Sequence, residues 1–471
     1  MTYRSSSGTV VSLAGKIGSG GEATLYHVVG NATTAVKIYH DRPTASRSNK
    51  IRQMLATPPH DPAADAGHVS IAWPVDVVSD ETGVVGLMMP LVAGSKPLAI
   101  LANPTTRRQQ TPGFTWRHLI TIAKNVATIV SALHTKGYVI GDLNALNFLV
   151  SNRALVTLID CDSIQVPNER GALFLCPVGT AEFTPPELIG ADFSQTPRQD
   201  TADRFSLAVL LFQLLMEGTH PFQGIWLGSG DPSNPAELIR AGAYAHDPKS
   251  TVMRPPPSAL SIELLPPEVV AMFIRAFVDG HRDPQRRPSA AEWKQSLGRC
   301  ESTLTTCSKS ALHVFPRHVA SCPWCTRTSQ LGDDTWLAVS APIWRPPEVH
   351  RSPGARTTMP PGAATYPAPT GFWSTIARAI RRSFTGVSAP RPTPMPSPTP
   401  TQRPTPRPVT VTTRPTTLTP GPTVVANRFT GKFHRPTCEW ANRISVSNRT
   451  SIGSQEARRL GMVACKVCRP T

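Results

Sequence analysis

Three polar side chains in the middle of the chain have the types and spacing that metal-assisted phosphoryl transfer needs. Asp142 and Asn147 lie five residues apart in the segment 139–147, and Asp160 ends an apolar run. Phosphoryl transfer needs a carboxylate that orients the attacking hydroxyl, and oxygen ligands that hold Mg²⁺. We therefore assign Asp142 to the acceptor, and Asn147 and Asp160 to Mg²⁺. Any single Asp is more often a turn or cap residue, so the prediction depends on the set.

A glycine-rich turn near the N-terminus offers backbone N–H groups to phosphate oxygens. The residues predicted to bind nucleotide there are Ile17, Gly18, Ser19, Gly20, Gly21 and Glu22. Lys37 follows in a later β-rich run, where its charge can neutralise the α- and β-phosphates and complete the catalytic set. A plain hairpin turn and a surface lysine are the alternatives when each feature is taken alone.

The elements that must position these residues change character along the chain. Residues 9–92 contain β-rich runs and one helical stretch, 46–57. Helices predominate after residue 115, beginning with apolar positions three or four residues apart across 119–133. A small β-rich part followed by a larger helical part predicts an α+β fold with a cleft between the two.

In this order the motifs resemble a protein-kinase domain over about residues 9–300. The resemblance implies a bilobal kinase fold that binds ATP and Mg²⁺, with an N-lobe at 1–92 and a C-lobe at 93–299. It further implies phosphate transfer to protein Ser/Thr hydroxyls.

The same resemblance implies an adenine pocket in the strand that ends near residue 92. Met89 would guard the back of the pocket, Pro90 would offer a carbonyl to the adenine amino group, and Val92 would donate an N–H to the ring. A proline is tolerated at that position because no backbone N–H donor is needed there.

Further motifs of the resemblance concern the C-lobe and the partners. Asp203 would tie down the catalytic loop, and Arg287 would pair with Glu187. The segments VIGDLN and LIDCDS are similar to a bacterial kinase subfamily with C-terminal accessory domains. Members of that subfamily are often encoded beside a metal-dependent phosphatase and a von Willebrand A-type protein, which are therefore the implied partners besides protein substrates.

Three segments of the C-lobe depart from the kinase pattern. Ile140-Gly141 stand where His-Arg usually precede the catalytic Asp, which removes the partner of an activation-segment phosphate. Asn144 replaces a Lys usual in Ser/Thr kinases. Cys161-Asp162 replace the Phe-Gly that follows the metal-binding Asp.

A fourth departure lies in the N-lobe, where the helical stretch 46–57 contains no acid to pair with Lys37. Glu22 in the glycine loop is the nearest substitute. The missing acid favours an alternative function, that of a nucleotide-binding pseudokinase scaffold. The complete phosphoryl-transfer set favours an active kinase.

A Cys/His segment at 300–330 predicts a small zinc ribbon-like module. Its ligands would be Cys307, Cys322, Cys325 and one histidine. His313 and His318 compete for the fourth position; we prefer His313, because it begins a strand-like run. An unmetallated pair of core cysteines is the alternative.

A second set of ligands, His434, Cys438, Cys465 and Cys468, lies in the segment 425–471. This segment resembles the small metal-binding domain related to the N-terminal domain of Ada-type DNA-repair proteins, which implies structural Zn²⁺. So short a module has little core of its own, which favours stabilisation by a metal. Its basic residues suggest nucleic-acid binding, with a solubilising surface or protein docking as alternatives.

The net charge of +17 comes almost entirely from the part after residue 340, so a uniformly basic nucleic-acid-binding protein is excluded. Residues 331–424 hold 20 of the 49 prolines and should form a disordered Pro/Thr/Arg-rich linker. The apolar run 205–216 is too short to span a bilayer. We see no transmembrane segment or signal peptide, and expect a cytoplasmic protein.

Overall fold

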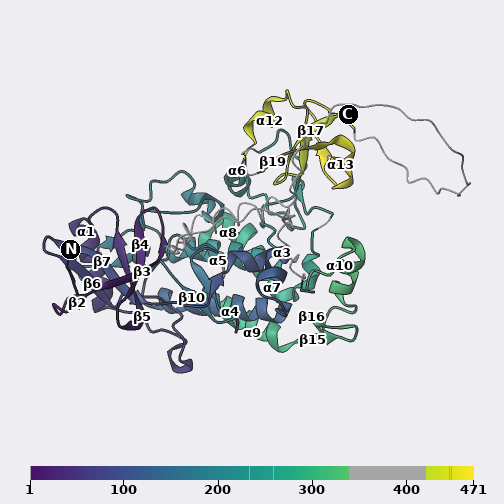
Figure 1. The fold of residues 1–471 in the computed structure, drawn as a ribbon. Coiled ribbons are helices and arrows are strands. Elements are labelled where there is room, and N and C mark those ends of the chain that lie inside the picture. The colour runs from purple at the N-terminus through teal and green to yellow at the C-terminus, as the bar shows by residue number, and fades with distance from the viewer. Residues whose placement is uncertain are drawn as a thin grey trace, which may run out of the picture.

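The computed structural model describes residues 2–338, apart from 233 and 258, and residues 421–470, apart from 445 and 447. A β-rich N-terminal lobe adjoins a helical lobe, and the C-terminal module lies beside helix α6 (Pro235–Arg240) (Figure 1). Most of the predicted linker, residues 339–420, falls outside the described residues. No helix in the described part of the chain is long and apolar enough to cross a membrane.

The N-terminal lobe is built on a seven-stranded sheet with the order β2-β1-β6-β7-β5-β4-β3. Its strands are β1 (Tyr3–Arg4), β2 (Val10–Val11), β3 (Leu13–Ser19), β4 (Ala23–Val28), β5 (Asn31–Tyr39), β6 (Asp76–Asp80) and β7 (Gly83–Pro90). Side chains alternate along β5, so Val36 packs on one face while Ala35, Lys37 and Tyr39 share the other. Helix α1 (Ala45–Ala56) covers that second face with buried Ile51. Lys37 therefore points into the space between sheet and helix.

The C-terminal lobe is organised around two long helices, α4 (Trp116–Thr135) and α5 (Asp200–Leu215). Apolar residues three or four apart bury one face of α4, and a capping box between Thr115 and His118 begins the helix. Nearly every residue of α5 is buried, as expected of a helix at the centre of a lobe. The surrounding helices are α2 (Ala99–Ala102), α3 (Pro104–Gln110), α7 (Pro267–Ile274), α8 (Gly280–Arg282) and α9 (Ala290–Ser302).

Short strands lie where the two lobes meet and on the outer side of the C-lobe. A three-stranded sheet, β8 (Lys96–Pro97), β9 (Phe148–Val150) and β10 (Val156–Leu158), has the order β10-β9-β8. Two antiparallel pairs of strands are formed by β11 (Val166–Pro167) with β12 (Leu173–Phe174), and by β13 (Ile225–Trp226) with β14 (Met253–Arg254). The loops beside β9 and β10 carry three of the predicted catalytic residues, Asp142, Asn147 and Asp160.

The first Cys/His segment packs onto the C-lobe. It consists of the hairpin β15 (Leu304–Cys307) and β16 (Ser310–Pro316), followed by α10 (Pro323–Leu331). Trp324 is 1% exposed and belongs to the main apolar core, near Trp116 of α4. Trp336, which the sequence placed in the linker, is also buried against Trp324. The hairpin and helix thus extend the hydrophobic core of the lobe.

The C-terminal module is a four-stranded sheet with two short helices. Its elements are β17 (Thr423–Asn427), β18 (Lys432–His434), α12 (Glu439–Arg443), β19 (Arg449–Gly453), α13 (Ser454–Arg459) and β20 (Val463–Ala464), and the strand order is β19-β17-β18-β20. One small core contains Cys438 and Cys465, and another contains Phe433 and Ala457. Each core is small, as the length of the module requires.

Candidate active site and metal centres

A cavity of about 630 Å³ is lined by both lobes, and most of the predicted nucleotide-binding residues contribute to it. These residues are Ile17, Gly20, Gly21, Glu22, Lys37, Met89, Pro90, Val92, Asn147 and Asp160. Gly18 and Ser19, which pair with Leu25 and Thr24 in the β3–β4 hairpin, do not line it. Sequence reasoning missed the apolar lining, which includes Leu25, Leu149 and Ile159. The alternation of side chains along strands was the signal that could have found Leu25.

Asp203 of α5 holds the loop that carries Asp142. The carboxylate of Asp203 accepts hydrogen bonds from the backbone N–H groups of Ile140 and Gly141, at 2.7 and 2.8 Å. His134 of α4 also contacts it at 3.0 Å. Asp203 is completely buried, so the loop is fixed to α5 as the resemblance implied.

Asp142 itself does not line this cavity; it lines a small hollow together with Thr180, in the segment that follows Asp160. Thr180 Oγ1 donates to Asp142 Oδ1 at 2.8 Å. Asn147 Nδ2 donates to the backbone carbonyl of Asp142 at 2.8 Å, so the amide oxygen of Asn147 is the atom that can bind a metal. Asn144 reaches both the Asp142 carbonyl and the Thr180 hydroxyl, at 3.2 and 3.4 Å.

Lys37 is paired with two carboxylates from one short segment. Its Nζ atom lies 2.5 Å from Asp160 and 2.6 Å from Asp162. Asp162 is buried and also accepts a hydrogen bond from Tyr39 at 2.7 Å. Burial lowers the pKa of Lys37, but the charges of Asp162 and Asp160 outweigh this and raise its pKa overall. Burial raises the pKa of Asp162, but Lys37 brings it below its usual range.

The predicted replacement for the missing helix acid is wrong, because Glu22 does not contact Lys37. Its carboxylate pairs instead with Arg47 of α1 at 2.7 Å, and the Glu22 side chain is 58% exposed. Arg47 also lies 3.3 Å from Asp162 and stacks over the ring of Tyr39. The buried negative charge beside Lys37 therefore comes from Asp162, one of the two residues that replace the usual Phe-Gly.

Arg198 fills the space next to Gly141. A Cβ atom at Gly141, where φ is +78°, would lie 2.5 Å from Arg198 Nη1. The Arg198 guanidinium donates to the carbonyl of Val178 at 2.6 Å and lies over the ring of Phe193. Arg198 is 5% exposed, and its guanidinium has a backbone carbonyl as a partner without any phosphate.

Glu187 and Arg287 form the ion pair that the resemblance implied. Arg287 donates through Nη1 and Nη2 to the two carboxylate oxygens of Glu187, at 2.7 and 2.8 Å. Such a two-bond pair fixes both groups, and Arg287 is completely buried. It anchors the end of the segment that begins at Asp160.

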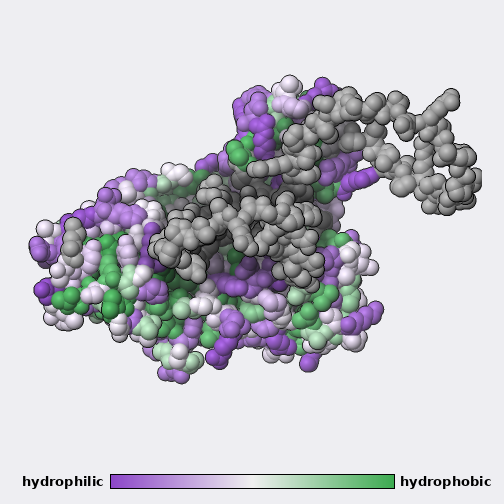
Figure 2. Space-filling model, viewed as in Figure 1, coloured by the Kyte–Doolittle hydropathy of each residue, from purple (hydrophilic) through white to green (hydrophobic). Residues whose placement is uncertain are grey.

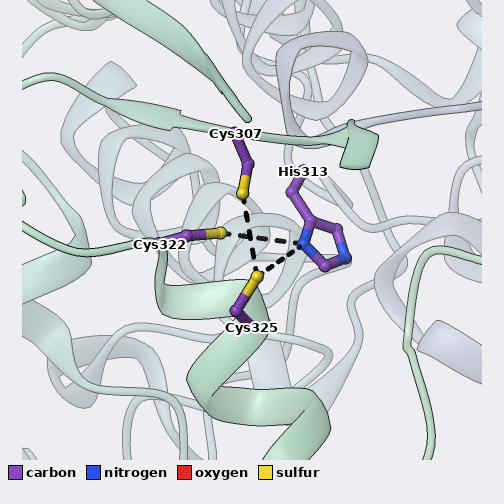
Figure 3. A group of neighbouring side chains, drawn as sticks. All are labelled: Cys307, His313, Cys322 and Cys325. Carbon is purple, nitrogen blue, oxygen red and sulfur yellow. Dashed lines mark hydrogen bonds between the residues drawn. The ribbon is translucent and has the colours of Figure 1, made fainter. Parts of the chain in front are cut away.

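The first Cys/His group converges as Figure 3 shows, with Cys307 and His313 on the β15–β16 hairpin and Cys322 and Cys325 at the start of α10. The ligand atoms of all four residues lie within 4.8 Å of one another. Cys307 Sγ and Cys325 Sγ are 3.7 Å apart, close to the ~3.8 Å that a tetrahedral zinc with 2.3 Å bonds requires. His318 faces elsewhere, with Nε2 3.1 Å from the Glu263 carbonyl.

The second group, His434, Cys438, Cys465 and Cys468, converges in the same way. His434 Nδ1 lies 3.7 Å from Cys438 Sγ, so Nδ1 is the ring atom that faces the thiols. The donor sets, three thiols and one imidazole each, suit structural Zn²⁺ and leave no open position for catalysis. Both groups therefore fit zinc.

Comparisons with known proteins agree with this geometry. The protein kinase domain family matches residues 11–297. Protein kinase YegI of Escherichia coli K12 is 37% identical over 332 residues, which cover 69% of this chain and 50% of that protein. MAP kinase-interacting serine/threonine-protein kinase 2 of Xenopus laevis is 25% identical over 214 residues, 42% of each chain. The chain spans about half the length of the YegI proteins that it matches.

Proposed function

The chain belongs to the protein kinase family, and we propose that it transfers the γ-phosphate of ATP to Ser/Thr hydroxyl groups of protein substrates. One observation carries this proposal. Lys37, Asn147 and Asp160 line one cavity, and Asp142 lies directly beside Asn147. Positioning and charge neutralisation are most of what phosphoryl transfer asks of a protein, and this set supplies both.

Each of these residues has a role in the proposed reaction. Asp142 accepts a hydrogen bond from the acceptor hydroxyl, in the position where Thr180 now donates, and takes its proton. The amide oxygen of Asn147 and the carboxylate of Asp160 would hold Mg²⁺, which neutralises charge on the phosphates when bound. Lys37 neutralises the α- and β-phosphates, while the buried carboxylate of Asp162 holds its ammonium group in place.

The proposal is tested with the full chain, Mg²⁺ and γ-labelled ATP, with phosphate transfer measured on the chain itself and on a generic protein substrate. Asp142→Asn should lower the rate about 10²–10⁴-fold, the usual contribution of a general base, with nucleotide affinity nearly unchanged. Asp200→Asn is a matched control, because Asp200 pairs with Arg204 away from the cavity. Full activity of Asp142→Asn would overturn the proposed role.

A pseudokinase scaffold is the second candidate, because α1 supplies no acid to Lys37. The two functions differ in one measurement. A scaffold binds ATP, detected as a rise in the melting temperature, without transferring label under any condition. A kinase shows both, and loses transfer but keeps binding when Asp142 is changed.

We propose that both Cys/His modules hold structural zinc and that the C-terminal module recruits partners. Polar residues predominate on the visible outer face of this module (Figure 2). Nucleic acid is the weaker alternative as a ligand, because some of the basic residues are already engaged. Lys432 is 1% exposed and donates to backbone carbonyls, and Arg443 pairs with Glu439. The phosphatase and von Willebrand A-type partners stay predictions, to be sought by co-purification.

A further inference from the structure

The C-terminal module is seated on the C-lobe through backbone hydrogen bonds. The N–H of Gly224 donates to the carbonyl of Phe429 at 3.1 Å, and the N–H of Trp226 donates to that of Thr430 at 2.9 Å. Phe429 belongs to the main core of the C-lobe, and its ring lies 5.6 Å from that of His220. The loop between β17 and β18 thus pairs with strand β13 of the kinase domain.

Polar side chains of the module also donate hydrogen bonds to backbone carbonyls of the kinase domain close to β13. Lys432 Nζ donates to the carbonyl of Gly228 at 3.2 Å and to that of Gly230. Lys466 Nζ donates to the carbonyl of Leu227 at 3.3 Å. Residues 224–231 are therefore contacted by β18, which carries His434, and by the turn that joins Cys465 to Cys468.

The contact reaches the metal group itself at Asp231. Asp231 Oδ2 lies 2.8 Å from His434 Nε2 and 3.3 Å from Asn427 Nδ2. His434 and Asp231 are 0% and 2% exposed. With Nδ1 facing the thiols, the Nε2–H of His434 donates to this carboxylate, an arrangement that fixes the tautomer and orientation of a zinc-binding histidine.

The first Cys/His group has the same arrangement, built from its own segment. His313 Nδ1 faces the thiols of Cys322 and Cys325, and His313 Nε2 lies 2.9 Å from Asp334 Oδ2. Asp334 lies three residues after the end of α10 in the chain. In the second group the corresponding carboxylate lies 203 residues away, in the kinase domain.

We infer that the C-terminal zinc site is shared between two domains, with Asp231 of the kinase domain as its positioning residue. Zinc binding orients His434 toward Asp231, and docking supplies the carboxylate that the coordinated imidazole needs. Zinc binding therefore raises the equilibrium constant for docking, and docking raises the affinity for zinc by the same factor. Zinc in this module holds it on residues 224–231, next to the loop where His220 contacts the Glu182 carbonyl.

The test uses the full chain loaded with zinc and carrying Asp231→Asn, with Asp334→Asn as the matched control. Zinc release is followed by titration with a chelating indicator. Outer carboxylates of this kind contribute about 10–100-fold to metal affinity. Asp231→Asn should weaken one of the two zinc equivalents by that factor, and Asp334→Asn should weaken the other. If Asp231→Asn changes neither equivalent, the inference is wrong.

Docking has its own readout, amide hydrogen exchange of the segment that contains Gly224 and Trp226. These amides should lose protection in Asp231→Asn and in Cys438→Ser, which removes a tail ligand without touching the kinase domain. Exchange in α4 and α5 should not change, which shows that the kinase domain stays folded. Unchanged protection of the Gly224–Trp226 segment in Cys438→Ser would overturn the coupling. Neither measurement depends on kinase activity.

Discussion

The Nζ atom of Lys37 lies 2.6 Å from Oδ1 of Asp162, a carboxylate whose side chain is 3% exposed. Asp162 comes two residues after Asp160, the carboxylate proposed to bind Mg²⁺. Because α1 contains no acid, Asp162 supplies the buried negative charge that holds the lysine. Arg47 of α1 closes the network from the helix side, 3.3 Å from the same carboxylate.

The first prediction concerns this pair. Asp162→Asn leaves Lys37 with Asp160 as its remaining carboxylate, and should lower the free energy of unfolding by about 1–3 kcal/mol, the usual cost when a buried polar group loses a hydrogen-bond partner. It should also lower kcat/KM for ATP. Glu22→Gln is the control: it breaks an exposed pair and should cost no more than about 1 kcal/mol. Urea unfolding and kinase assays measure both, and equal effects of the two changes would contradict the assignment.

The second prediction concerns Arg198. Because its guanidinium holds the Val178 carbonyl, the activation segment should keep its place without phosphorylation. Phosphatase treatment of the protein should therefore leave kinase activity unchanged. Arg198→Gln should lower activity, whereas Arg170→Gln, in an exposed turn of the same segment, should not. A large loss of activity after phosphatase treatment would show that a phosphate is needed after all.

The third prediction concerns the two metal groups. Trp324 of α10 lies in the main core of the C-lobe, so disruption of the first group should destabilise the kinase domain. Cys322→Ser should lower its melting temperature by roughly 3 °C, which corresponds to about 2 kcal/mol in a domain of about 300 residues. Cys468→Ser, in the second group, should lower it less. Differential scanning calorimetry compares the two, and the reverse order would refute the prediction.

The fourth prediction is a pH dependence that comes from His220. Burial lowers the pKa of His220 to about 4, whereas an unfolded histidine has a pKa near 6.5. Below pH 6.5 the unfolded chain binds the extra proton, so stability should fall as the pH drops from 6.5 to 4, by roughly 3 kcal/mol in all. His220→Gln keeps a donor for the Glu182 carbonyl without titrating. Its urea-unfolding curves should lack this component, and parallel pH profiles for both proteins would contradict the prediction.

Much of the site could be predicted from the sequence because its residues lie in short motifs. The spacing of Asp142 and Asn147, and the position of Asp160 after an apolar strand, are local features of the chain. Most residues of the glycine loop and the predicted adenine-pocket residues also lie in short motifs, and they line the cavity. The four-residue Cys/His groups were also visible as spacings typical of zinc sites.

The partners of these residues were decided by the tertiary structure. Glu22 is closer to Lys37 in sequence, but Asp162 reaches it because a strand and a loop 125 residues apart meet in the fold. Arg198 takes the space beside Gly141, and Asp231 meets His434, for the same reason. A buried charge is stabilised by whichever group packs against it. The spacing of residues within a short motif does not show which distant segments will pack together. The sequence by itself therefore indicated which side chains we propose for the chemistry, and the fold determined which groups hold them in place.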